Sequence, residues 1–280
     1  MVSNQSFSVT ALMEKEDFHI EPISRRIKVY ELPDEISESY MKGLHAVAEE
    51  MDCDKIIVYV QTGSDAETTV KDFSFQQEAE IKGFFNGKDA TIYASFLDQS
   101  RNLPDPENVI SDVKAMNVAE CKKRKLQEGY SMIWGTEEHA EEMAAFYASV
   151  FDQYPTPIHD PEYIVQMMRD DVYFSLIYHE GELVSACSAD LFTDFNAAEF
   201  TDCATLSSQR GKGLLSIQYP MLEKKMRELG VHTMFSYTRA ISMGMNIVAA
   251  QQGFSYGGCM VQNSTIATGL EDMNIWYKAL

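Results

Sequence analysis

The sequence has few of the features that mark several common classes of protein. Its five cysteines are widely spaced and form no C-x-x-C pair, so we expect neither a disulfide framework nor a zinc site. Its histidines include no pair four residues apart and no H-E-x-x-H motif, which leaves a metal site unsupported. No run approaches the roughly 18 apolar residues of a membrane-spanning helix, and the first residues contain no apolar signal region. We therefore expect a reduced, soluble, cytoplasmic protein without a metal cofactor.

Positive charge is scarce as well. The chain contains 23 lysine and arginine residues against 43 aspartate and glutamate residues, which gives a formal net charge of −20. A general nucleic-acid-binding protein would carry a basic surface, so this class is disfavoured. The acidic excess suits a cationic small-molecule substrate, and an acidic surface that keeps the protein soluble would account for most of the same charges.

What is present is a regular alternation of helix and strand patterns, typical of an α/β fold with a mixed sheet. The 280 residues, 45% of them hydrophobic, suffice for two domains. We expect a loose polar leader at 1–16, a smaller domain with a connecting helix at 17–128, and a second domain at 129–280. Helices are predicted at 37–52, 66–73, 107–126, 136–151, 161–169, 214–229 and 243–251. Strands are predicted at 25–32, 55–61, 79–85, 90–96, 130–134, 173–179, 183–191, 199–206, 232–239, 257–266 and 273–279.

The two halves show a weak internal similarity in the order of their predicted elements, here called the echo. Segments 55–96 and 232–280 both read as strand, helix, strand, turn and strand. Either a duplicated unit or ordinary α/β alternation explains this order, and the sequence leaves both open. In either case the first half lacks a counterpart of the glycine-rich turn described next, which predicts one active site per chain.

The most informative segment is the strand pattern at 199–206, followed by S-S-Q-R-G-K-G-L at 207–214 and a helical pattern to Leu229. The first N–H groups of a helix have no partner within the helix, so a glycine turn placed there favours phosphate binding. The spacing is neither that of a P-loop nor that of the three-glycine dinucleotide motif. Within the helix, Pro220 is expected to leave the carbonyl group of Ser216 without its helical partner.

This segment resembles the pyrophosphate-binding turn of the GCN5-related N-acetyltransferases, whose pattern is Q/R-x-x-G-x-G/A. Gly211 and Gly213 match that pattern, whereas Ser208 occupies the first position. The runs at 198–206, 242–246, 256–258, 263–266 and 273–278 look like those of β-lysine N6-acetyltransferases, and the run at 83–90 resembles their truncated N-terminal half. The resemblance implies an acetyltransferase fold at the C-terminus, preceded by a smaller, degenerate domain of the same kind. It also implies acetyl-CoA as the donor and N6-acetyl-β-lysine, an osmolyte, as the product.

The resemblance further implies which residues bind the cofactor. The turn and the start of the helix would hold its pyrophosphate, and an asparagine on the last helix would contact its pantetheine arm. In this chain these residues are Leu206, Gln209, Arg210, Gly211, Lys212, Gly213, Leu214 and Asn246.

Acetylation of an amine requires a base, because a lysine-type amine with a pKa near 10.4 is almost fully protonated at neutral pH. Glu199 and Asp202 are the candidates, and strand alternation places them on opposite faces unless a bulge intervenes. We favour Glu199 as the base, acting through water, with Asp202 holding the substrate cation or orienting neighbouring groups. A purely structural pair of Asp202 with a buried arginine such as Arg239 is the alternative. Backbone N–H groups near Leu206 would stabilise the oxyanion. The tyrosine that often acts as the acid in this superfamily is missing, which leaves Tyr256, Tyr237 or an unassisted thiolate as alternatives.

The acceptor side of the site needs a cation for the substrate carboxylate, and Arg239 is our candidate because a guanidinium binds carboxylates bidentately. Tyr154 and Asp160 are expected to wall this side. Two alternatives remain open: acetylation of another amine, such as a polyamine or an antibiotic, and a non-catalytic module that binds acetyl-CoA or an amino acid. Homodimer formation is also left open.

Overall fold

The computed structural model describes residues 18–33, 36–116, 124–267 and 269–280. The expected leader at 1–16 lies outside these residues. The N-terminal half contains β1 (Phe18–Glu21), η1 (Pro22–Ser24), β2 (Arg26–Val29), α2 (Glu38–Glu50), β3 (Lys55–Gln61), α3 (Asp65–Asp72), β4 (Gln76–Phe85) and β5 (Lys88–Phe96). The connection that follows contains η2 (Gln99–Arg101) and α4 (Ile110–Ala115).

The C-terminal half contains β6 (Tyr130–Trp134), η3 (Glu137–His139), α5 (Ala140–Val150), α6 (Pro161–Arg169), β7 (Val172–His179), β8 (Glu182–Phe192) and η4 (Thr193–Phe195). It continues with β9 (Ala197–Thr205), η5 (Ser207–Gln209), α7 (Leu214–Glu228), β10 (Thr233–Arg239), α8 (Met243–Gln251), β11 (Ser255–Ile266) and β12 (Gly269–Ala279). Among the helices that the structure describes, none has both the length and the apolarity required to cross a bilayer.

Local sequence signals explain most of these boundaries. Ser37 caps α2 by accepting a hydrogen bond from the backbone N–H of Tyr40 at 3.1 Å. Asn86 and Gly87 both adopt positive φ and join β4 to β5 in a two-residue hairpin turn. The carbonyl oxygen of Ser216, left without a helical partner by Pro220, accepts a hydrogen bond from the side chain of Gln252 at 3.5 Å.

The connecting helix was predicted incorrectly. We expected a helix over 107–126, but α4 spans only Ile110–Ala115, and residues 124–126 are not helical. The basic run at 122–125, read as the cationic end of that helix, lies partly outside the described residues. Pro104 and Pro106 placed the start slightly too early, since residues 107–109 are not helical, and no comparably strong stop signal was available for the end.

The described strands form one 12-stranded sheet in the order β1-β2-β3-β5-β4-β11-β12-β10-β9-β8-β7-β6. In the N-terminal half, β2 and β3 are parallel and joined through α2, β5 pairs antiparallel with β3, and β4 pairs antiparallel with β5. In the C-terminal half, β9 and β10 are parallel and joined through α7, and β12 and β11 follow in the same manner. The echo noticed in the sequence is therefore a repeated topology, with the two copies meeting at β4 and β11.

This junction depends on two glycines. The backbones of β4 and β11 pair at Ala79 and Gly258. An added Cβ at Gly257 would lie 2.2 Å from the carbonyl oxygen of Glu80, and one at Gly258 would lie 2.3 Å from that of Glu78. Only glycine permits so close an approach of the two backbones.

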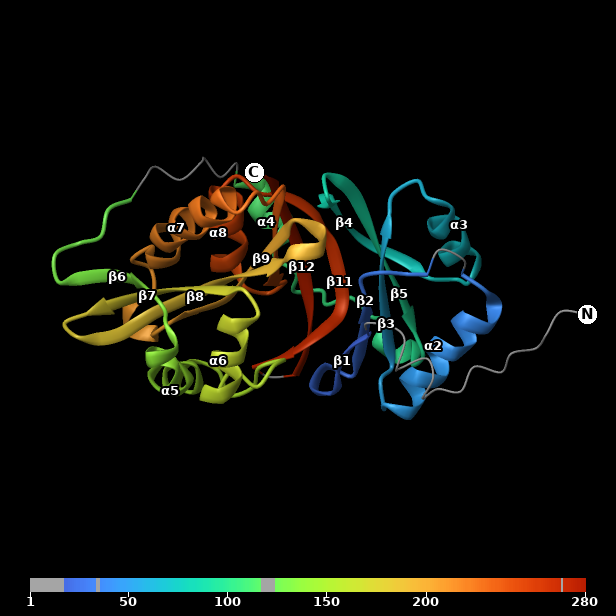
Figure 1. Ribbon diagram of the computed structural model, residues 1–280, viewed down its shortest axis with the longest axis horizontal. Helices are drawn as coiled ribbons and strands as arrows, with labels where there is room; N and C mark the ends of the chain where they lie inside the picture. Colours follow the sequence, from blue (N-terminus) through green and yellow to red (C-terminus); the bar gives the residue numbers. More distant parts are fainter. Residues whose placement is uncertain (1–17, 34–35, 117–123, 268) are drawn as a thin grey trace, which may run out of the picture.

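Helices cover the sheet in three groups. Figure 1 shows α5 and α6 on one side of the C-terminal half of the sheet, with α7 and α8 on the other side. In the N-terminal half, α2 and α3 cover only one face, against Ile56, Val58 and Val60 of β3. The alternate residues Ile57 and Tyr59 pack with Phe235 and Ile275 of the C-terminal half. The second face of the small half is thus buried against the larger one, which explains why β3 is apolar at almost every position.

Candidate active site

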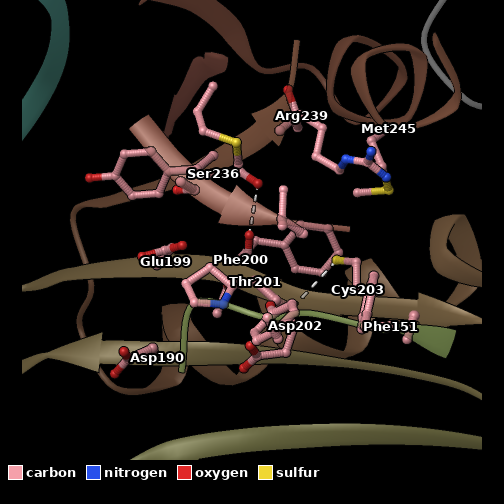
Figure 2. Close-up of a pocket in the computed structure, with 18 of the residues that line it drawn as sticks. Phe151, Asp190, Glu199, Phe200, Thr201, Asp202, Cys203, Ser236, Arg239 and Met245 are labelled. Atoms are coloured by element: carbon pink, nitrogen blue, oxygen red, sulfur yellow. Dashed lines mark hydrogen bonds between the residues drawn. The ribbon is translucent and has the colours of Figure 1, made fainter. Parts of the chain in front are cut away.

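A cavity of about 1200 Å³ lies where the two halves meet. It is lined by β9, β10, the start of α7, α8 and the loop at 154–157 on the C-terminal side, and by β1, η1 and β2 on the N-terminal side. Figure 2 shows the residues of β9 and β10 that form its centre. Pairing between β9 and β10 extends only from Ala197–Thr233 to Glu199–Phe235, and beyond this point the two strands separate.

A β-bulge lies at the centre of the cavity wall. Ser188 pairs with Thr201 and Ala186 with Ala204, so Cys187 of β8 faces two residues of β9, Asp202 and Cys203. Asp202 adopts a φ of 50°, in the left-handed region. The bulge that the sequence required is therefore present, and both Glu199 and Asp202 line the cavity.

Glu199 lies beside a second carboxylate. It pairs in register with Asp190 of β8, and Figure 2 shows both side chains at the end of the pocket away from Arg239 and Met245. Burial raises the pKa of Glu199 to about 8; Lys28 opposes this shift, whereas Asp190 and Asp202 add to it. Burial and the nearby Asp202 also raise the pKa of Asp190, to about 6. Glu199 can therefore take up or release a proton close to neutral pH.

The carboxylate of Asp202 is already hydrogen-bonded to other side chains of the protein. Its carboxylate accepts hydrogen bonds from Ser188 Oγ at 2.6 Å and from Tyr154 Oη at 2.8 Å, and its side chain is buried. Tyr147 Oη donates to its backbone carbonyl at 2.9 Å. These bonds hold the bulge in place and do not favour the expected contact between Asp202 and a substrate cation. The alternative of a pair with Arg239 is wrong, because this arginine has another partner.

That partner is Glu271. Arg239 Nε and Nη2 donate to its two carboxylate oxygens at 2.7 and 2.6 Å, and the Glu271 side chain is only 6% exposed. Arg239 does line the cavity, as a residue that binds the substrate carboxylate must. A substrate carboxylate would nevertheless have to compete with one that already occupies the guanidinium in bidentate geometry. This placement does not favour Arg239 as the carboxylate-binding residue.

The glycine turn opens onto the cavity. Gly211 and Gly213 have φ values of 78° and 74°, and Gly213 is the N-cap of α7, so no capping side chain accepts hydrogen bonds from the first N–H groups of the helix. The part of the predicted cofactor segment that lines the cavity is Gln209, Arg210, Gly211, Gly213 and Leu214. Exposed helix N–H groups beside left-handed glycines form a site suited to phosphate.

Two residues of that segment face elsewhere. The N–H group of Leu206, expected to help stabilise the oxyanion, donates to the carbonyl of Val184 at 3.0 Å. Lys212 Nζ donates to Tyr130 Oη at 2.7 Å and to Gln209 Oε1 at 2.6 Å. Neither residue is among those that line the cavity.

Asn246 also lies outside the cavity lining. Its side chain is fully buried and donates to the carbonyls of Arg239 at 3.0 Å and Ser242 at 2.9 Å. Its Oδ1 accepts from Thr238 and Trp276 at 2.9 and 3.0 Å. With these bonds Asn246 fixes the start of α8 against β10 and β12, and the expected contact with a pantetheine arm is not favoured.

The remaining candidate site residues, Tyr154, Asp160 and Tyr256, differ in whether they reach the cavity. Tyr154 lines the cavity, whereas Asp160 does not and instead caps α6 by accepting from the N–H of Glu162 at 2.9 Å. Tyr256 also lies outside the lining, and its hydroxyl contacts Asn274 Oδ1 at 3.4 Å. Burial raises the pKa of Tyr256 above its usual range, whereas an acid serving a thiolate would need a lower one. The placement of Tyr256 does not favour it as the acid.

The sequence did not reveal the contribution of the N-terminal half. Glu21, Arg26, Lys28 and Tyr30 all line the cavity, although they come from the small half. The available signal was weak: positions 26, 28 and 30 alternate along one strand and share a face. Nothing in that pattern indicated which part of the C-terminal half this face would meet.

Comparison with known proteins gives consistent matches over the whole length. Residues 140–254 match the model of the acetyltransferase (GNAT) family. The chain is 33% identical over 280 residues to the N-acetyltransferase YodP of Bacillus subtilis, covering 99% of both proteins. It is 30% identical over 263 residues to a β-lysine N(6)-acetyltransferase of Methanococcus maripaludis, covering 92% of this chain and 94% of the relative. A protein of the same name from Methanosarcina mazei is 30% identical over 266 residues, covering 87% of this chain and 97% of the relative.

Proposed function

The chain belongs to the GNAT family of acetyl-CoA-dependent N-acetyltransferases, and from this premise we propose that its acceptor is a small diamino acid, with β-lysine acetylated at its terminal amine. The names of two relatives support this choice of acceptor. The product, N6-acetyl-β-lysine, would carry one ammonium and one carboxylate and no net charge. A neutral zwitterion suits a role as a compatible solute, which we include in the proposal.

The observation that carries the proposal is the acidic pair of Asp190 and Glu199. The two carboxylates are cross-strand neighbours on the cavity wall, and no ion pair joins either of them to another described residue. An acceptor with two ammonium groups could place one beside each carboxylate. In the low-dielectric cavity the unpaired acidic groups are costly to ionise, and a cationic substrate relieves that cost.

The proposed reaction is a direct transfer. Glu199 takes a proton from the terminal ammonium, directly or through water, and the freed amine attacks the thioester carbonyl. Beyond the Glu199–Phe235 pair the register between β9 and β10 ends, and Ser236 Oγ donates to the carbonyl of Phe200 at 2.7 Å. We place the pantetheine arm and the thioester oxygen along β9 past Phe200. The C–S bond then breaks, and the thiolate, whose conjugate thiol has a pKa of about 8.5, leaves without an assisting side-chain acid. The nitrogen of the new bond then gives its extra proton, through water, to the thiolate, which yields the neutral amide and coenzyme A.

The direct test is the release of coenzyme A from acetyl-CoA in the presence of different amines. We expect the highest kcat/KM with β-lysine, a lower value with α-lysine, and the lowest with polyamines. Activity confined to lysine side chains of proteins would refute the proposal. Preference for a polyamine would assign the acidic pair to a different acceptor, and acetyl-CoA binding without turnover of any amine would favour a non-catalytic module.

A further inference from the structure

The small N-terminal half contributes a charged cluster to the cavity. Glu21 is the last residue of β1, and Arg26 and Lys28 lie on β2, with all three side chains mostly buried. Burial alone would raise the pKa of Glu21, but Lys28 and Arg26 lower it to about 2. Glu21 is therefore ionised throughout the physiological range. The cluster holds two cations and one anion.

Arg26 has a structural role within this cluster. Its Nε donates to Glu21 Oε2 at 2.8 Å, and its Nη1 donates to Asn263 O at 2.6 Å and to Ser264 Oγ at 2.8 Å. The last two contacts reach β11 in the C-terminal half. Arg26 therefore links β2 to β11, and these N–H groups are used by protein acceptors.

Lys28 has donors left over. Its ammonium lies 2.8 Å from Glu21 Oε1, which is its single anionic partner among the described residues, and its side chain is 10% exposed. An ammonium has three N–H donors. The Nζ atom lies 5.4 Å from the centre of the Tyr237 ring, and the charge of Lys28 lowers the pKa of both Glu199 and Asp190. The surplus positive charge thus faces the same space as the two carboxylates.

We propose that Lys28 binds the carboxylate of the acceptor and that the N-terminal half thereby selects diamino acids over diamines. This inference rests on the proposed function. In this arrangement the terminal amine lies at Glu199, the second ammonium at Asp190 and the carboxylate at Lys28. Arg239, the candidate from the sequence, is already paired with Glu271, so Lys28 is the cavity-lining cation with unused donors next to Glu199. A diamine without a carboxylate would leave the excess positive charge of the cluster of Glu21, Arg26 and Lys28 unbalanced beside a second ammonium, which disfavours its binding.

The test compares two acceptors that differ only in the carboxylate: β-lysine and 1,4-diaminopentane. The variant is Lys28→Gln in the full chain, because glutamine can still donate to Glu21 but has no charge. Loss of Lys28 also raises the pKa of Glu199, so both acceptors are assayed at one pH above about 8, where this effect on the base is common to both and cancels in the ratio. We expect the ratio of kcat/KM for β-lysine to that for the diamine to fall about tenfold to hundredfold, mainly through the KM of β-lysine.

Two further variants separate charge from structure. Lys28→Arg keeps the cation and should retain most of the ratio, whereas Lys82→Met removes an exposed lysine of the same half and should leave the ratio unchanged. The inference is overturned if Lys28→Gln keeps the wild-type ratio, including the case in which kcat/KM falls equally for both acceptors. If Lys28→Gln does not fold, Lys28→Arg provides the test. A folded Lys28→Arg variant that no longer prefers β-lysine over the diamine would contradict a carboxylate contact made by the positive charge. Wild-type protein that releases coenzyme A with neither amine refutes the proposed function itself and the inference with it.

Discussion

At the scale of single residues, the ionisation of Glu199 sets the pH at which the amine can be deprotonated. The groups that face it are Lys28 from β2, Asp190 from β8 and Asp202 from β9, and burial with these neighbours places its pKa at about 8. The base is active when ionised, so the rate should rise with pH along a limb centred at about 8. The acceptor's own ammonium, with a pKa near 10.4, adds a separate limb at higher pH.

We predict that Glu199→Gln removes the limb at about 8 and lowers kcat by about 10²–10⁴-fold. The measurement is a pH profile of coenzyme A release at saturating acetyl-CoA. Asp190→Asn is the matched variant: it removes a like charge beside Glu199, so the limb should move to lower pH. An unchanged profile in Glu199→Gln would exclude Glu199 as the base.

The same ionisation affects stability. The folded state binds the proton of Glu199 more tightly than the unfolded chain, because the pKa is raised from 4.5 to about 8. Between these values the free energy of unfolding should fall as the pH rises, and this contribution should be missing in Glu199→Gln.

How far single residues could be predicted depended on whether their role was local. Strand alternation alone placed Glu199 and Asp202 on opposite faces of the strand, and the resemblance to the acetyltransferase fold made a bulge that brings both to the cavity reasonable. The pairing of Arg239 with Glu271 and the bonds of Asn246 with Asn274 and Trp276 could not be predicted, because these partners are distant in the sequence. Pattern identifies the face on which a residue lies, but not the side chain that it meets.

At the scale of elements, the glycine turn before α7 offers a controlled comparison. Gly211 and Gly230 have φ values of 78° and 80°, and an added Cβ would meet no atom within 4 Å at either position. Gly211 lines the cavity, whereas Gly230 follows the other end of α7 and does not. Alanine at either site should therefore cost a similar backbone strain of about 1 kcal/mol.

We predict that Gly211→Ala raises the KM for acetyl-CoA about tenfold, because the new methyl group and the strained turn disturb the N–H groups that bind the pyrophosphate. Gly230→Ala should leave this KM unchanged while losing the same amount of stability. Steady-state kinetics and thermal unfolding of both variants provide the check. Equal KM values for the two variants would remove the turn from the cofactor site.

The boundaries of helices and strands could be predicted where the sequence contains a clear start or stop signal. The helix at 161–169 and the strand at 55–61 were predicted as observed, since a proline begins the first and a continuous apolar run defines the second. The connecting helix was predicted too long: residues 107–109 and 124–126 are not helical, and no glycine or proline between 107 and 126 marked a closer boundary.

At the scale of the whole molecule, the two halves share one strand arrangement, but the glycine turn occurs in the C-terminal half alone. The parallel pair β2–β3 repeats β9–β10, and the second copy alone carries the glycine turn. The sequence indicated this repeat only as an echo. It could not show that β1 and β2 would form a wall of the other half's cavity, because that contact depends on the β4–β11 junction.

A buried ion pair strengthens that junction. Lys55 Nζ lies 3.0 Å from Glu78 Oε1, with both side chains almost completely buried. Lys55 also donates to the carbonyl of Val261 at 2.7 Å, and Glu78 accepts from the N–H of Val261 at 2.8 Å. Burial lowers the pKa of Lys55 to about 8, opposed by Glu78. The pair from the small half therefore holds the backbone of β11 in the large half.

We predict that Lys55→Met lowers the free energy of unfolding by about 3–5 kcal/mol, because it leaves the carboxylate of Glu78 buried without its cation. The matched control is Lys42→Met, which breaks an exposed pair with Glu38 and should cost about 0.5 kcal/mol or less. Urea unfolding is followed by circular dichroism and by the fluorescence of Trp134 and Trp276, both of which lie in the C-terminal half. Since the halves share one sheet, the two signals should shift together in Lys55→Met. A shift in circular dichroism with unchanged fluorescence would mean that the halves unfold independently, and the acceptor wall could then be lost while the acetyltransferase half remained folded.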